Sequence, residues 1–207
     1  MYVRYRKDIF ENEDIMKQEF IFPVITFLGK YSATANMINT TMGCILFEFA
    51  INQITRNVDK VKSCLVELAK NDIIELHTKL DKLNTPIILT VNDPISWVAL
   101  HDFEIDTINK LVKDNLISYK IGDVFMAIKF NAHSYNDPRN NTNKYGSVIY
   151  GYSRLMNWSG ITNNASMSKY INLLGDTDIL KVNKTKLRDE TGKTFKTTHE
   201  YSFKEIK

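Results

Sequence analysis

The sequence is poor in several residue types that mark particular classes of protein. It has two cysteines and four histidines, and no set of them has the spacing of a zinc site. Both cysteines, Cys44 and Cys64, lie in apolar helical patterns, so we expect buried free thiols in a reducing compartment. We therefore predict neither a metal centre nor any other cofactor.

Glycine and long apolar stretches are scarce as well. The eight glycines do not cluster, so the chain has no glycine-rich loop for binding phosphate. Each apolar stretch is too short to cross a bilayer, and residues 1–8 lead into an acidic run rather than the apolar core of a signal peptide. These absences predict a cytoplasmic protein that makes no membrane contact.

Groupings typical of catalytic sites are also missing. No Ser/His/Asp or paired-carboxylate arrangement stands out, and no histidine pair accompanies a tyrosine as it does in a rolling-circle nickase. We therefore predict that the chain is not an enzyme.

The charges that are present are unevenly distributed. The net charge of the chain is +3, but residues 181–207 alone carry +4, so that the first 180 residues sum to −1. A local positive surface is what contact with phosphate requires, although a solvated basic tail would give the same count. The candidate phosphate contacts in this segment are Lys184, Lys186, Arg188, Lys193 and Lys196.

One pattern occurs twice, 106 residues apart. Residues 55–74 and 161–180 each read as a polar cap, an amphipathic helix, an aspartate and an apolar pair that begins a strand. The matched positions are Asn57 with Asn163, Leu65 with Ile171, Leu68 with Leu174, Asp72 with Asp178, and 73–74 with 179–180. Matched caps and core spacing predict two copies of one structural unit.

Hydrophobic periodicity predicts the same element order around each copy: helix, strand, helix, helix, strand, strand. The first copy comprises helix 18–32, strand 36–39, helix 42–51 after a cap at Thr40 or Thr41, turn 55–57, helix 58–71, and strands 73–76 and 87–91. The second comprises helix 121–132, strand 148–150, helix 152–158, a helix capped by Asn163 or Asn164, and strands 179–182 and 198–203 around a loop at 183–197. The sequence therefore predicts an α+β fold, mostly α, with domains at 1–93 and 121–207 and a connector at 94–120 that contains a helix.

The third helix of each copy has the composition of a DNA-reading helix. Apolar residues hold one face on the core, and short polar or basic side chains are left outward near the N-terminal end, from which recognition helices contact bases. The outward residues are Arg56, Asn57, Lys60 and Lys62 in the first copy, and Asn163, Asn164, Ser166, Ser168 and Lys169 in the second.

These patterns resemble a known family. Residues 152–180 are similar to the helix-turn-helix of bacterial winged-helix proteins, and the whole arrangement resembles the tandem winged-helix replication initiators and replisome organisers of plasmids and phages. The resemblance implies two tandem winged-helix domains joined by a helical connector. It also implies sequence-specific binding of double-stranded DNA at the repeats of a replication origin. The high Asn, Lys and Ile content is typical of low-GC bacterial or phage genomes.

Several alternatives stay open at this point. The first copy departs from the family pattern, because its turn lacks glycine and Asp59 and Glu67 place acid on its helix. A transcriptional regulator on the same fold is one alternative, and a replisome or segregation adaptor in which only the C-terminal domain binds DNA is another. In a third alternative, the helices of residues 55–74 and 161–180 are ordinary surface helices that do not contact DNA. The candidate partners are double-stranded DNA, a second copy of the chain in a homodimer, and replication proteins.

Overall fold

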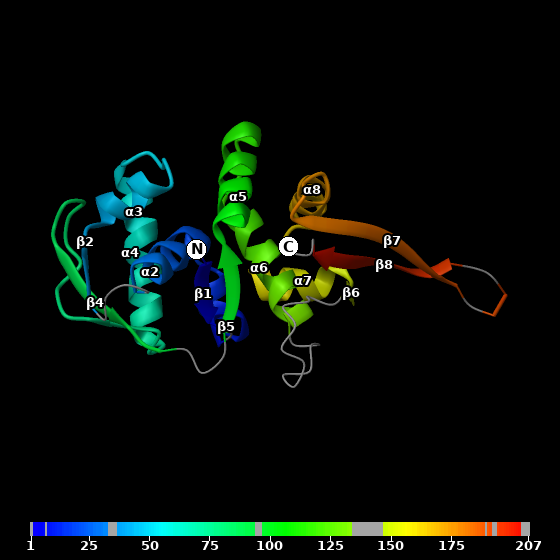
Figure 1. The fold of residues 1–207 in the computed structure, drawn as a ribbon, viewed down its shortest axis with the longest axis horizontal. Helices are drawn as coiled ribbons and strands as arrows, with labels where there is room; N and C mark the ends of the chain where they lie inside the picture. Colours follow the sequence, from blue (N-terminus) through cyan, green and yellow to red (C-terminus); the bar gives the residue numbers. More distant parts are fainter. Residues whose placement is uncertain are drawn as a thin grey trace. The chain divides into compact units, whose positions relative to one another are not determined.

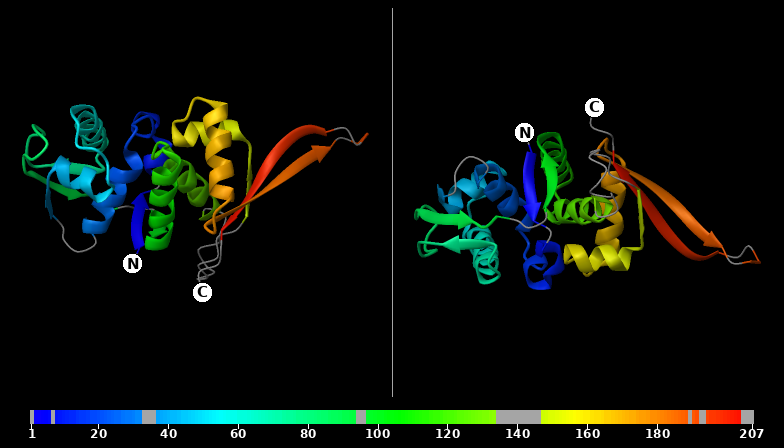
Figure 2. Two further views of the ribbon diagram at one scale, coloured as in Figure 1. Left: turned by 90° about the horizontal axis from the view of Figure 1, so that it is seen from above. Right: turned by 60° about the horizontal axis from the view of Figure 1, so that its bottom comes forward.

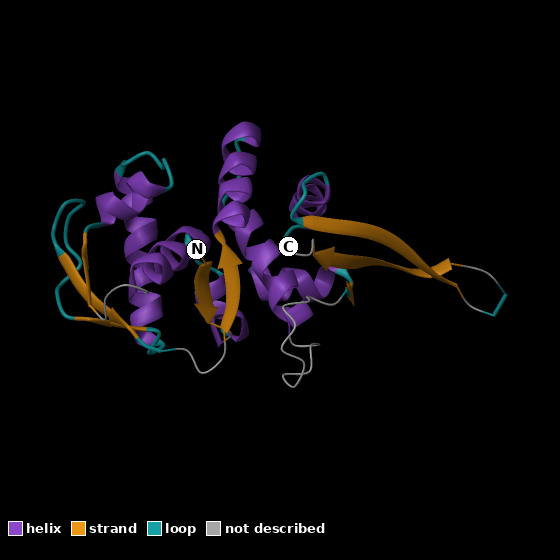
Figure 3. Cartoon of the chain, viewed as in Figure 1, coloured by secondary structure: helices purple, strands orange, loops and turns teal. Residues whose placement is uncertain are grey.

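The computed structural model describes residues 2–6, 8–32, 37–93, 97–133, 147–188, 190–191 and 194–203 (Figure 1). The chain divides into two compact units, residues 1–120 and 121–207. Helices predominate over strands, which form small antiparallel sheets (Figure 3). The predicted class, α+β and mostly helical, is confirmed.

The first unit contains a three-stranded sheet, a two-stranded sheet and the helices that cover them. Its elements are β1 (Tyr2–Arg6), η1 (Asp8–Glu11), α1 (Glu13–Met16), α2 (Ile21–Ser32), β2 (Met37–Thr40), α3 (Met42–Glu48), α4 (Thr55–Lys70), β3 (Ile74–Leu76), β4 (Ile87–Val91), β5 (Trp97–His101) and α5 (Asp102–Asn115). Cap chemistry sets the start of α3, since Thr41 Oγ1 accepts a hydrogen bond from Cys44 N at 3.0 Å. Of the two cysteines, Cys64 is buried as predicted, but Cys44 is exposed because it lies in the first turn of α3 beside this cap.

The helix α4 begins three residues earlier than the repeat predicts. Residues 55–57, predicted as a turn, are helical, and the N-cap is Ile54, whose side chain makes no capping hydrogen bond. Asn57 therefore lies inside α4, whereas its counterpart Asn163 is a true N-cap. The predicted match of the two caps is wrong, because Asn57 uses its amide differently: Asn57 Nδ2 donates to Asn52 O at 2.8 Å.

The second unit follows the predicted order. Its elements are α6 (Lys120–His133), β6 (Val148–Tyr150), α7 (Tyr152–Ser159), α8 (Asn164–Gly175), β7 (Leu180–Arg188) and β8 (Thr194–Phe203). The loop predicted at 183–197 is wrong, since β7 and β8 continue pairing to Arg188 and Thr194 (Figures 1 and 2). The outer part of this hairpin is polar, and so it lacks the apolar alternation by which a strand is recognised from sequence.

The two units share one topology. Each has a helix, a strand, two helices and two strands in that order, and in each the last strand is the central one of its sheet. The strand orders are β2-β4-β3 and β6-β8-β7, all antiparallel. The duplication inferred from residues 55–74 and 161–180 therefore extends to the sheets.

The segment predicted as a connector contributes a strand and a helix. Residues 94–96 lie outside the described part, and β5 and α5 follow. β5 pairs antiparallel with β1 over five residues, from Tyr2 opposite His101 to Arg6 opposite Trp97. This pairing joins residues that are 91 to 99 positions apart in the chain, and the local sequence pattern does not reveal it.

Candidate nucleic-acid interface

A sharp turn separates α7 from α8 in the second unit. Gly160 ends α7 with φ of 67°, a left-handed conformation that glycine adopts without strain. The next residue, Ile161, is buried, and its N–H donates to Met156 O at 3.2 Å. The chain then leaves the turn extended and starts α8 at once.

Asn163 starts α8 as its N-cap. Its Oδ1 accepts hydrogen bonds from Ala165 N at 2.7 Å and from Ser166 N at 3.4 Å. This cap satisfies backbone donors that would otherwise have no partner in the helix. The sequence prediction that Asn163 or Asn164 caps this helix is confirmed, with Asn163 in that role.

The two faces of α8 differ completely in burial. Met167, Tyr170, Ile171 and Leu174 are buried and fix the helix to its unit. The opposite surface carries the exposed residues Asn164, Ala165, Lys169 and Asn172, with Ser168 half-buried beside them. Among the described residues, no partner holds the side chains of Asn164, Ser168 and Lys169. Of the residues predicted here, Ser166 is half-buried at the flank.

The corresponding surface of α4 is partly covered by its own unit. Lys60 was predicted to point outward, but its Nζ lies 2.7 Å from Glu19 Oε2 and 5.1 Å from the ring centre of Phe20. One turn further, Ser63 donates to Gln18 Oε1 at 2.7 Å. The side chain of Lys60 is therefore already engaged within its own unit, because residues before α2 occupy that side of the helix.

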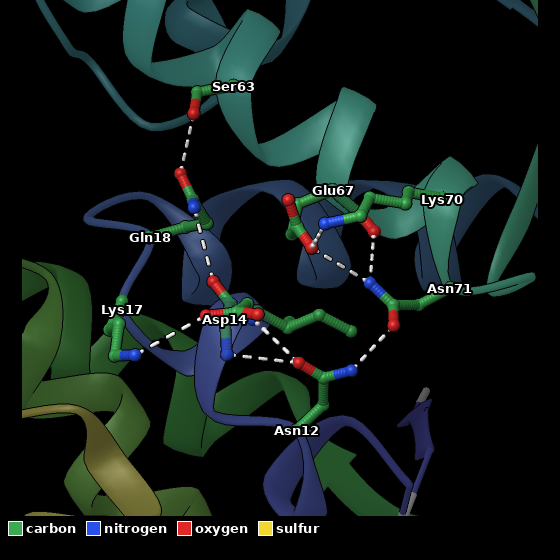
Figure 4. A network of polar contacts seen from close by, with 9 residues as sticks. Asn12, Asp14, Lys17, Gln18, Ser63, Glu67, Lys70 and Asn71 are labelled. Carbon is green, nitrogen blue, oxygen red and sulfur yellow. Dashed lines mark hydrogen bonds and ion pairs between the residues drawn. The ribbon is translucent and has the colours of Figure 1, made fainter.

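Further polar contacts continue along α4 (Figure 4), and we call the whole set of contacts between residues 12–19 and this helix the cover on α4. Asn12 Nδ2 donates to Asn71 Oδ1 at 2.6 Å, and Asn71 Nδ2 donates to Glu67 O at 2.8 Å. Glu67 also accepts from Lys70 at 3.3 Å. One side of α4, from Lys60 to its C-cap Asn71, is therefore in contact with the segment 12–19.

The remaining candidates on α4 are less engaged. Arg56 is exposed and Lys62 half-buried, and neither has a polar partner among the described residues. Arg56 lies one turn before Lys60 on the same side of the helix but is itself exposed, Lys62 lies on another side, and the exposed Asp59 lies between them. The basic surface left on α4 is thus small and interrupted by acid.

The hairpin after α8 carries the basic residues of the C-terminal segment. Lys181 and Lys184 are exposed on β7, and Lys184 is opposite His199 in the register. Lys186, Arg188 and Lys196 belong to the paired strands, but their side chains lie outside the described part, as does all of Lys193. The structure therefore places the predicted wing residues on one hairpin, with Lys184 the one whose side chain it describes.

An aromatic stack joins this hairpin to α7. The rings of Tyr152 and His199 are 4.7 Å apart and nearly parallel, at 11°, and Tyr201 lies 6.1 Å from His199. Burial, and secondarily the charge of Lys184, lowers the pKa of His199 below its ordinary value. His199 is therefore held neutral, and the stack fixes the base of the hairpin against the helix-turn-helix.

The described residues also bear on the predicted absence of metal and membrane contact. Within them, no three His, Cys, Asp or Glu side chains come together as a metal site would require. No helix there has both the length and the apolar character to cross a membrane.

Comparisons with known proteins leave the chain without an assigned relative. No protein-family model matches it, and no curated protein matches it significantly. The site is therefore interpreted from its own geometry.

Sequence reasoning missed one surface. The outer face of the β1–β5 sheet gathers Tyr2, Arg4, Trp97 and His101, which come from opposite ends of the first unit's sequence. The alternation of apolar and basic residues in Tyr2–Arg6 was the available signal, but it does not identify the partner strand, and Trp97–His101 has no such alternation.

Proposed function

We propose that the chain is a sequence-specific double-stranded DNA-binding protein of the replication-initiator type, with the second unit as its main reading head. The uncovered outer surface of α8 carries the proposal. This helix follows a glycine-ended turn, presents Asn164 and Lys169 near its N-terminal end, and leads into a long basic hairpin. That order of turn, helix and wing is what a winged helix uses in the major groove.

The chemistry of these side chains suits duplex DNA. An asparagine at the start of a recognition helix can form a bidentate pair with adenine, in which its Nδ2 donates to N7 and its Oδ1 accepts from N6. Lys169 and Lys184 are exposed cations on the helix and the hairpin, where they can contact phosphates without breaking an ion pair. The replication role rests on the resemblance to plasmid and phage initiators and on the shared topology of the two units.

The test is binding to DNA from the gene's own locus, measured by footprinting and by fluorescence anisotropy at two salt concentrations. We expect a footprint on repeated sequences. Asn164→Ala should weaken specific binding by about 1–3 kcal/mol, or about 5- to 150-fold in Kd. Lys169→Ala should reduce the slope of log K against log salt by about 0.9.

Asn172→Ala is the matched control, because Asn172 is exposed on the same side of α8 but about two turns from its start. It should change affinity little. The absence of protection at either salt concentration refutes the DNA-binding proposal, and protection confined to a promoter favours a transcriptional regulator.

A second candidate function is favoured by the cover on α4. The contacts of Lys60 with Glu19 and of Ser63 with Gln18 occupy the side of α4 that would approach DNA. Under this second hypothesis the first unit binds a protein partner, and only the second unit binds DNA. Unchanged DNA affinity in the double variant Arg56→Ala/Lys62→Ala supports it, and a clear loss supports two reading heads.

A further inference from the structure

The two-stranded sheet of the first unit, formed by β1 and β5 (Figure 3), has one face that is buried and one that is not. Val3, Tyr5, Val98 and Leu100 are all buried on the inner face. The alternate residues of both strands form the outer face: Tyr2, Arg4 and Arg6 from β1, and Trp97, Ala99 and His101 from β5. The burial of the inner face fixes the orientation of the outer residues.

The outer face carries a row of aromatic rings, Trp97, Tyr2, His101 and Phe103, which we call the aromatic row. Tyr2 is parallel to Trp97 at 5.8 Å and 11°, and lies 6.2 Å from His101. Phe103, at the start of α5, continues the row at 5.9 Å and 21° from His101. Tyr2 is 43% exposed and Phe103 is 44% exposed, so each ring keeps part of its surface open to a ligand although it stacks on a neighbouring ring.

The small Ala99 accounts for the close approach of the rings. It lies opposite Arg4, between the positions of Trp97 and His101, and its methyl group leaves space above the sheet. Tyr2 and Trp97, although four positions apart in register, can therefore lean toward one another over the Arg4–Ala99 pair.

The charge at the Trp97 end of the aromatic row is positive, whereas Asp102 and Glu104 flank Phe103 at the other end. Arg4 is exposed, with its guanidinium carbon 5.0 Å from the centre of the Trp97 ring. Neither strand contains an acidic residue. Of the acids next to the strands, Asp8 accepts a hydrogen bond from Arg6 Nε at 3.0 Å, and Asp102 begins α5. Arg4 is therefore a cation set among rings and available to an anion.

Exposed rings beside a cation match the chemistry of an unpaired nucleotide strand. Unpaired bases stack on aromatic side chains, and a neighbouring arginine contacts the phosphate or stacks on a base. In a duplex the base faces are already stacked on each other, so exposed rings offer it little. A protein partner would bury the rings equally well, but would not need the positive charge among them.

We propose that the outer face of the β1–β5 sheet binds single-stranded nucleic acid, with bases stacked on Tyr2 and Phe103 and phosphate contacted by Arg4. This activity goes beyond duplex binding by α8 and does not depend on it. Asn164→Ala, which should weaken duplex binding by α8, should leave single-strand binding unchanged.

The experiment measures binding of the full chain to labelled 12-nucleotide dT and rU oligonucleotides by fluorescence anisotropy, with an unrelated duplex as a third arm. Comparison of the dT and rU arms distinguishes DNA from RNA as the ligand. We expect Tyr2→Leu and Phe103→Ala each to weaken oligonucleotide binding about 5- to 150-fold. Tyr2→Phe keeps the ring and should bind within about twofold of the parent chain.

Phe47→Ala is the matched control. Phe47 is a 78% exposed phenylalanine on α3 of the same unit, away from the β1–β5 sheet, and its removal should leave binding unchanged. Arg4→Ala should reduce the slope of log K against log salt by about 0.7, the value for one phosphate of a single strand.

Three results would overturn the proposal. The parent chain could fail to bind either oligonucleotide at low salt, or Phe47→Ala could weaken binding as much as Phe103→Ala. As a third such result, Tyr2→Leu could change the self-association of the chain in sedimentation while oligonucleotide binding stays intact. The aromatic row would then be an interface between copies of the chain.

Discussion

Gly29→Ala separates the effect of helix propensity from the effect of tertiary packing. Gly29 lies inside α2, where alanine is favoured over glycine by about 0.8–1.0 kcal/mol. A Cβ at this position would lie 2.3 Å from Val3 Cγ1 and 3.4 Å from Arg4 O of β1. Overpacking of a core costs about 1–3 kcal/mol, and a 2.3 Å contact belongs at the upper end. We therefore expect a net loss of about 2 kcal/mol.

A double-mutant cycle with Val3→Ala assigns that loss to its cause. Val3→Ala alone should cost about 1.6 kcal/mol for two buried methylene equivalents, more if a cavity remains. With the valine methyls gone, Gly29→Ala should change sign and stabilise the unit by about 0.8–1.0 kcal/mol.

Urea unfolding followed by Trp97 fluorescence, in a Trp158→Phe background, reports the first unit alone. The reasoning is refuted if Gly29→Ala raises the urea midpoint of the chain that retains Val3. An equal effect in both backgrounds would refute it as well.

Two further predictions concern the second unit. Because burial and Lys184 lower the pKa of His199 below 6.5, the unfolded chain takes up a proton there before the folded one does. The folded state therefore keeps its full stability above about pH 6.5 and loses part of it as the pH falls toward the pKa of His199 in the folded chain. His199→Gln should remove this loss, so that the melting temperature depends less on pH below about pH 6.5. Asn163→Ala removes the N-cap of α8 and should lower the free energy of unfolding by about 1 kcal/mol in a thermal melt. Asn164 does not cap the helix, so Asn164→Ala should change the free energy of unfolding by less than about 0.5 kcal/mol. A similar loss in both asparagine variants would contradict the cap, and an unchanged pH dependence in His199→Gln would contradict the buried neutral histidine.

The sequence predicted those elements whose start and end are encoded locally. Thr41 and Asn163 have side chains that cap a helix, and Gly160 has the backbone freedom that ends one, so α3, α7 and α8 fell close to their expected ranges. The start of α4 was missed because Ile54 caps it without a side-chain hydrogen bond. An uncapped helix start leaves no residue type to recognise.

Features that depend on distant contacts could not be predicted in this way. The cover on α4 joins Asn12 to Asn71 and Gln18 to Ser63, and the pairing of β1 with β5 joins the two ends of the first unit's sequence. Such contacts follow from tertiary packing rather than from propensity or periodicity. The sequence already predicted two unequal copies, because the turn of the first lacks glycine and its helix carries Asp59 and Glu67. The contacts that cover α4 are a further difference, and the sequence did not predict them.

The strength of the cover on α4 decides how unequal the two units are. The ion pair of Lys60 with Glu19 is partly exposed and contributes about 1 kcal/mol or less. The exposed hydrogen bond from Ser63 to Gln18 contributes about 0.5–1.5 kcal/mol net. Removal of both to admit DNA would cost about 0.5–2.5 kcal/mol, which lowers affinity about 2- to 70-fold. A duplex can overcome such a barrier only with compensating contacts, and the short basic surface of Arg56 and Lys62, shared with Asp59, offers few. Since α8 has no such cover on Asn164 and Lys169, DNA should engage the second unit first.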